Sequence, residues 1–76
     1  MNKYQQWIKD NPFSAGFCLG ATLQMSLAFP ELRRIKGVYI EPDGTRYPHW
    51  FCLDGNNIID PTADQFERGG EYEING

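Results

Sequence analysis

Two strong turn signals divide the second half of the chain into three short β-prone segments. Ile35–Glu41 is rich in Val, Tyr and Ile, and it ends at Pro42-Asp43-Gly44-Thr45, a sequence typical of a β-turn. Tyr47–Leu53 follows, and Asp54-Gly55 separates it from Asn56–Asp60 as in a hairpin. Because connections this short join antiparallel neighbours, the pattern predicts an antiparallel three-stranded sheet.

Apolar residues at helical spacing predict two helices before this sheet. The first spans Lys3–Lys9 and carries a face of aromatic and aliphatic side chains. The second runs from about Ala15 to Phe29, with Ser14 at its N-cap position. It is expected to end there because the residue before Pro30 avoids the helical region.

The second helix has an unusually wide apolar surface. Two neighbouring faces of it are formed by Cys18, Ala21, Met25 and Phe29 and by Leu19, Leu23 and Leu27. A surface this wide predicts a central, mostly buried helix. We therefore expect an α+β fold in which a central Cys-bearing helix packs on a small antiparallel three-stranded sheet. The chain is expected to be a single domain, 1–76, with a short N-terminal helix in 1–12, a core in 14–66 and a flexible tail in 68–76.

Length and charge narrow the classes of partner. The chain has 76 residues and a net charge of −3, and its densest basic group is Arg33-Arg34-x-Lys36, so we expect no nucleic-acid partner. The longest apolar stretch, about 17–29, is interrupted by polar residues and is too short to cross a bilayer. The N-terminus also lacks the apolar run of a signal peptide. These features predict a cytoplasmic protein with no membrane partner.

The two cysteines, Cys18 and Cys52, are 34 residues apart in the sequence. A reducing cytosol disfavours a disulfide between them. Neither lies in a Cys-x-x-Cys pair or in a Cys/His pair with zinc spacing, so we expect no metal site.

The second hairpin brings a histidine and a carboxylate to one face of the sheet. A two-residue loop at Asp54-Gly55 places His49 directly opposite Asp60, and a four-residue loop shifts Asp60 to the position opposite Phe51. Since side chains alternate along a strand, His49 and Asp60 share a face in both registers, whereas a three-residue loop separates them. A carboxylate beside a histidine fixes its tautomer and stabilises the imidazolium, as in the base of a nucleophilic triad.

Cys18 is the candidate nucleophile for such a triad. It lies in the first turn of the predicted central helix, where the helix N-terminus favours a thiolate. The sheet is expected to bury its Phe51 face against this helix, which would bring Cys18 toward His49 and leave Cys52 on the other side. The alternatives from spacing alone are that Cys18 is a small core residue, that His49 only forms a structural hydrogen bond, and that Asp60 is a turn residue.

The C-terminal half resembles the ending of a group of small, uncharacterised bacterial and phage proteins. The matching run is His49-Trp50-Phe51, then Asp54-Gly55, Ile59-Asp60-Pro61-Thr62 and Gln65-Phe66, preceded by Gly16-Phe17-Cys18 and Phe29-Pro30-Glu31-Leu32. The order of Cys helix, His strand and Asp strand is similar to that of the transglutaminase-like and papain-like superfamily. The resemblance covers about residues 14–66 and implies a minimal papain-like core.

Carried over residue by residue, the resemblance makes Cys18 the nucleophile, His49 the general base and acid, and Asp60 the orienting carboxylate. Many papain-like enzymes have a Gln shortly before the Cys as oxyanion donor, but this sequence has no Gln between Gln6 and Cys18. The backbone N–H of Cys18, with a second amide or Gln65, is the expected oxyanion donor instead.

Two hypotheses for function follow. The first is a cysteine-dependent acyl-transfer enzyme, a protease, deamidase, amidase or transglutaminase-like protein, which needs no cofactor and acts on a protein, peptide or amide substrate. The second is a small non-catalytic binding or inhibitor protein, of phage or mobile-element origin, that binds a host protein through a sheet face bearing Trp50 and Ile59. Both a monomer and a homodimer are compatible with the sequence.

Overall fold

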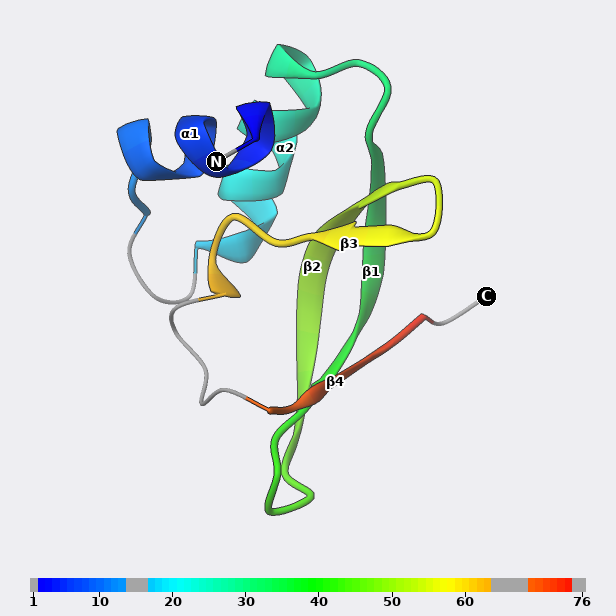
Figure 1. The fold of residues 1–76 in the computed structure, drawn as a ribbon. Helices are drawn as coiled ribbons and strands as arrows, with labels where there is room; N and C mark the ends of the chain where they lie inside the picture. The colour runs from blue at the N-terminus through cyan, green and yellow to red at the C-terminus, as the bar shows by residue number, and fades with distance from the viewer. Residues whose placement is uncertain (1, 14–16, 64–68, 75–76) are drawn as a thin grey trace.

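A computed structural model describes residues 2–13, 17–63 and 69–74 of the chain. Its elements form two helices followed by four strands (Figure 1). They are α1 (Lys3–Asp10), α2 (Cys18–Ala28), β1 (Arg33–Ile40), β2 (Arg46–Asp54), β3 (Asn57–Ile59) and β4 (Glu71–Glu73). No helix within these residues is both long and apolar enough to span a membrane.

The four strands form one antiparallel sheet in the order β3-β2-β1-β4. The long central pair, β1 and β2, is aligned with Gly37 opposite His49. The two outer strands are short, and both cross in front of the central pair in Figure 1, so the sheet curls into a half-barrel. Side chains on the concave face of this curl therefore approach one another from strands that are not neighbours.

The expected three-stranded sheet with one central helix is wrong. The sheet has a fourth strand, β4. The helices α1 and α2 lie together at the end of the sheet where β1 begins (Figure 1). The fourth strand, β4, lies in the segment expected to be a tail. Its three residues alternate charged, aromatic and charged, a pattern too short to identify as a strand in the sequence. Tyr72 docks on the ring of Phe51, with centroids 5.0 Å apart, and Glu73 forms a 2.7 Å ion pair with Arg46.

Gly37 makes room for β4. A side chain at this position of β1 would collide with the backbone carbonyl of Glu73 and press against the ring of Phe51. The absence of a Cβ therefore lets the last strand and the aromatic ring approach the centre of the sheet.

The second helix is less buried than its composition predicts. It begins at Cys18, because Phe17 is its N-cap residue, and it ends before Pro30; the expected N-cap Ser14 lies outside the described residues. Small or slender side chains form its buried face: Ala21, Thr22 and Met25. The Leu row of the helix is exposed instead: Leu19, Leu23 and Leu27. The expectation of a mostly buried helix is therefore wrong, since only one of its two apolar faces packs on the protein.

Both helices pack on a core cluster that contains Cys52. Its buried members are Tyr4, Met25, Leu32 and Cys52, with Trp7, Ile8, Phe29 and Ile59 packed around them. Cys52 Sγ lies 3.9 Å from the backbone oxygen of Thr22 in α2. The expectation that Cys52 points away from the helix is therefore wrong, and so is the reason for which the sequence placed Cys18 near His49, namely that the helix packs on the face opposite to Cys52. Alternation along β2 sends His49 and Phe51 to the opposite, concave face.

Burial of Cys52 makes stability sensitive to alkaline pH. Burial raises the pKa of its thiol from the ordinary 9.0 to about 11. Between these pH values the unfolded thiol is ionised while the folded thiol keeps its proton, so stability falls as the pH rises. We expect Cys52 to contribute a loss of about 2 kcal/mol from pH 9 to pH 11.

Urea unfolding at pH 7, 9 and 10.5 measures this loss. Cys52→Ala should show a shallower decline than the wild-type chain over the same range, whatever its stability at pH 7. An equal decline in both proteins would show that Cys52 does not titrate as its burial implies.

Candidate active site

His49 is fixed on the concave face of the sheet by β2 and by aromatic neighbours. Its side chain is only 1% exposed. Its ring stacks on Phe51, with centroids 6.2 Å apart, and lies edge-on to Tyr39 at 6.5 Å. A buried imidazole held on several sides has few accessible orientations, so its hydrogen bonds are well defined.

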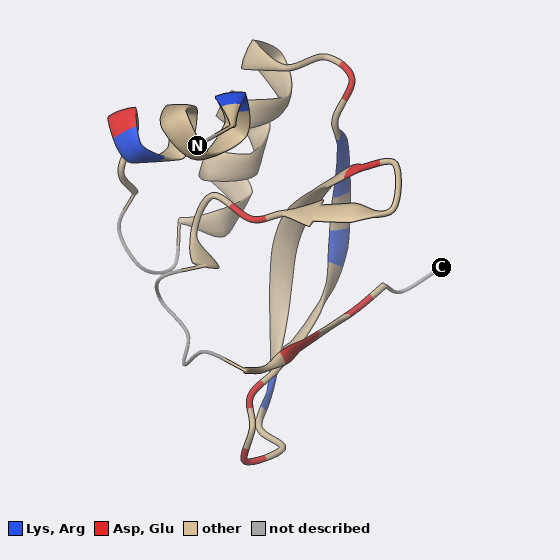
Figure 2. Ribbon diagram, in the orientation of Figure 1, with Lys and Arg blue, Asp and Glu red and all other residues tan. Residues whose placement is uncertain are grey.

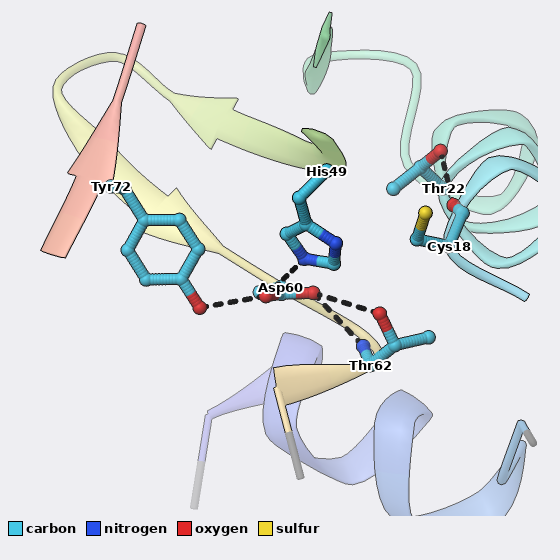
Figure 3. Close-up of polar contacts among 6 residues, drawn as sticks. All are labelled: Cys18, Thr22, His49, Asp60, Thr62 and Tyr72. Carbon is cyan, nitrogen blue, oxygen red and sulfur yellow. Dashed lines mark hydrogen bonds and ion pairs between the residues drawn. The ribbon is translucent and has the colours of Figure 1, made fainter. Parts of the chain in front are cut away.

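Asp60 meets His49 from the end of β3. Hairpin pairing sets Cys52 opposite Ile59, which is the alignment that puts Asp60 at the position opposite Phe51. His49 Nε2 and Asp60 Oδ2 are 2.7 Å apart, and the Asp60 side chain is 3% exposed (Figure 3). The structure thus brings together the histidine and the carboxylate that the sequence places on one face.

Asp60 accepts hydrogen bonds on both of its oxygens. Oδ1 accepts from the backbone N–H of Thr62 at 3.0 Å and from the Thr62 hydroxyl at 3.3 Å. Oδ2 accepts from the Tyr72 hydroxyl at 2.6 Å as well as from His49. The Tyr72 hydroxyl and both donors of Thr62 point at the carboxylate, and the network is satisfied when His49 Nε2 is a fourth donor. We assign the tautomer with the proton on Nε2 from this network.

Tyr72 is the residue of this network that the sequence does not reveal. Burial and the bond to Asp60 raise the pKa of its phenol far above the ordinary value, so it is a protonated donor at neutral pH. The only available signal is the alternation in Glu71-Tyr72-Glu73, which places one aromatic side chain between two charged ones.

Cys18 is the first residue of α2 and is partly buried. No side chain caps the helix at Phe17, and Ala21 donates the first backbone bond of the helix, to Phe17 O at 2.8 Å. Figure 3 draws Cys18 on the side of the His49 ring away from Asp60, and the second ring nitrogen, Nδ1, is turned to that side. Among the described residues no hydrogen bond joins the Cys18 thiol to His49.

Arg34 of β1 fastens the N-terminal half of α2 to the sheet, and its Nε donates to the Thr22 hydroxyl oxygen at 3.4 Å. The Thr22 hydroxyl donates to Cys18 O at 2.8 Å, and Arg34 reaches Leu19 O at 3.2 Å from β1. The Arg34 guanidinium also lies 4.7 Å from the centre of the Trp50 ring. Arg34 therefore covers the ring of Trp50, the residue that was expected to lie on a binding face of the sheet.

The remaining candidate residue, Gln65, lies outside the described residues. Within the described ranges no group of three His, Cys, Asp or Glu side chains is arranged to hold a metal ion. Comparison of the chain with models of protein families, with curated proteins and with solved structures finds no match. The resemblance to the bacterial and phage group therefore stays a prediction, and function has to be argued from the site.

Proposed function

We propose that this protein is a cysteine-dependent acyl-transfer enzyme in which Cys18 is the nucleophile, His49 the general base and acid, and Asp60 the orienting carboxylate. The observation that carries the proposal is the buried pair of His49 Nε2 and Asp60 Oδ2, which are 2.7 Å apart. The second ring nitrogen of His49, Nδ1, is turned to the side on which α2 begins with Cys18 (Figure 3). Protease, deamidase, amidase and transglutaminase-like reactions all use this chemistry.

The first half of the reaction forms a thioester. His49 Nδ1 takes the proton of the Cys18 thiol, and Sγ attacks the substrate carbonyl carbon to form a C–S bond and a tetrahedral oxyanion. When the intermediate collapses, the C–N bond breaks and the proton on Nδ1 passes to the leaving amine. Asp60 keeps its bond to Nε2–H throughout and stabilises the imidazolium while it carries both protons.

The second half releases the acyl group. His49 Nδ1 takes a proton from water as the water oxygen attacks the thioester, the C–S bond breaks, and the proton returns to the Cys18 sulfur. An amine in place of water gives a new amide by the same sequence of bonds. The acceptor therefore decides between hydrolysis and transfer.

Backbone amides at the start of α2 are the proposed oxyanion donors. The N–H groups of the first helical turn have no partner within their own helix, and Phe17 supplies no side-chain cap. The N–H of Cys18 lies beside the attacking sulfur, which is the position that an oxyanion donor needs.

Capture of the thioester tests the proposal. The wild-type chain is incubated at pH 7 with an activated ester, such as p-nitrophenyl acetate, and its intact mass is measured before and after digestion. We expect one acetyl group, located on Cys18, and none after Cys18→Ala. Acetylation that is equal on several nucleophiles, or that is unchanged by Cys18→Ala, would contradict the proposal.

A second candidate, binding of another protein without turnover, is favoured by a separate observation. The large apolar side chains at 17, 19, 23 and 27 are exposed on a helix that carries no charged residue (Figure 2). Exposed apolar surface of this kind marks interaction sites. If binding is the function, Leu23→Glu abolishes the biological effect and Cys18→Ala leaves it intact. If the protein acts by catalysis, Cys18→Ala abolishes the biological effect.

A further inference from the structure

Two donors converge on one oxygen of Asp60. Oδ2 accepts from His49 at 2.7 Å and from the Tyr72 hydroxyl at 2.6 Å, while Thr62 occupies Oδ1. Figure 3 shows Tyr72 and His49 reaching the carboxylate from different elements. The position of the Asp60 carboxylate is therefore determined from three directions, of which only the one from Thr62 is local in sequence.

The hydrogen bond from Tyr72 to Asp60 joins the two edges of the sheet. Tyr72 is the central residue of β4, and Asp60 directly follows β3, and these are the outermost strands in the order β3-β2-β1-β4. Their contact thus crosses the concave face and closes the curl of the sheet beside His49. Without β4 docked, Asp60 would lose one donor and this side of the site would open.

We propose that Tyr72 is a positioning residue of the active site: its hydroxyl holds Asp60 Oδ2 directed at His49, and it makes the site depend on the docking of β4. This inference rests on the proposed acyl-transfer function. Tyr72 acts through Asp60 and His49 and does not touch the reacting atoms.

The physical basis is the cost of a buried charge. A carboxylate removed from water is stable as an anion only when donors surround it. Without the Tyr72 hydroxyl, Oδ2 loses one of the two donors that hold it at Nε2, so the preference of neutral His49 for the tautomer with its proton on Nε2 weakens. In the other tautomer the proton is on Nδ1, which then cannot accept a proton from Cys18.

Tyr72→Phe isolates the hydroxyl from the packing. The ring stacks edge-on against Tyr39 and Phe51, each with centroids 5.0 Å apart, and phenylalanine preserves both contacts. In a Cys52→Ala background, we expect the rate of Cys18 alkylation by iodoacetamide at pH 6 to fall about tenfold. The two ring ¹⁵N signals of His49 should also converge, as exchange between tautomers requires. Tyr47→Phe, at an exposed tyrosine of β2, is the matched control and should change neither quantity.

The outcomes distinguish a failure of the positioning role of Tyr72 from a failure of the acyl-transfer proposal. If Tyr72→Phe lowers only the melting temperature and leaves both the alkylation rate and the ¹⁵N signals unchanged, the residue is structural and the inference is overturned. If the alkylation rate in the Cys52→Ala background does not depend on His49, the acyl-transfer proposal fails and the positioning role fails with it. Should Tyr72→Phe not fold, 3-fluorotyrosine at position 72 keeps the hydroxyl as a stronger donor. Incorporation of 3-fluorotyrosine should shift the Nε2–H resonance of His49, because both groups donate to Asp60 Oδ2. An unchanged resonance overturns the inference.

Discussion

Replacing His49 by alanine is expected to lower the rate of Cys18 acylation by an activated ester at pH 7 by about 100-fold. His49 is the chain's one histidine, the structure pairs its Nε2 with Asp60 at 2.7 Å, and in the proposed mechanism Nδ1 transfers the proton. Without that nitrogen, the thiol loses its base and the leaving group loses its acid. The rate is measured from the mass of acylated protein against time.

Loss of folding has to be separated from loss of chemistry, because His49 is buried. His49→Gln provides the matched variant, since its side-chain amide can still donate to Asp60 but cannot act as a base at neutral pH. Circular dichroism establishes the folded fraction of each variant. An acylation rate within about threefold of wild type in folded His49→Gln protein would contradict the assigned role.

Asp60→Ala is expected to destabilise the fold by about 3–5 kcal/mol. The substitution removes the acceptor of four hydrogen bonds, from His49, Tyr72 and both donors of Thr62, and leaves the donors in a buried site. It also releases the contact between the two outer strands. A loss of this size is most of the stability available to a domain of this length, so much of the protein should be unfolded at 37 °C.

Asp43→Ala is the matched control for this experiment. Asp43 is an exposed turn carboxylate that accepts from the backbone N–H of Thr45 at 2.9 Å, so its removal should cost about 1 kcal/mol or less. Urea unfolding at pH 7 compares the two. If Asp60→Ala costs no more than Asp43→Ala, the network around Asp60 does not hold the sheet together.

The pairing of His49 with Asp60 could be predicted because it depends on alternation and not on the exact loop. Shifting the hairpin by two residues keeps both side chains on one face, and the observed alignment puts Asp60 at the position opposite Phe51. The loops expected for this hairpin are wrong, because Asp54 pairs with Asn57 and the turn is Gly55-Asn56. The end of α2 and the positions of β1 and β2 were predictable because Pro30 and the turn at 42–45 bound them in the sequence, whereas β4 and the start of α2 were not predicted.

What the sequence could not reveal depends on long-range contacts. Tyr72 joins the site only because the sheet curls, and curling is decided by contacts such as the close approach of β4 to Gly37. In the same way, the apolar pattern of α2 identifies two apolar faces but not which one the sheet covers. Leu19, Leu23 and Leu27 are exposed, so the face that packs on the rest of the protein is the one with the smaller side chains.

The pH dependence of Cys18 alkylation tests the central claim most directly. Iodoacetamide labelling of the Cys52→Ala chain is followed from pH 4 to pH 10, with and without His49→Gln. A thiol activated by His49 should react nearly as fast at pH 6 as at pH 9, and it should lose that advantage in His49→Gln. A rate that rises about tenfold per pH unit up to about pH 8.5 in both proteins, as for an ordinary thiol, would contradict the claim, as would a thiol that is inert until the protein unfolds.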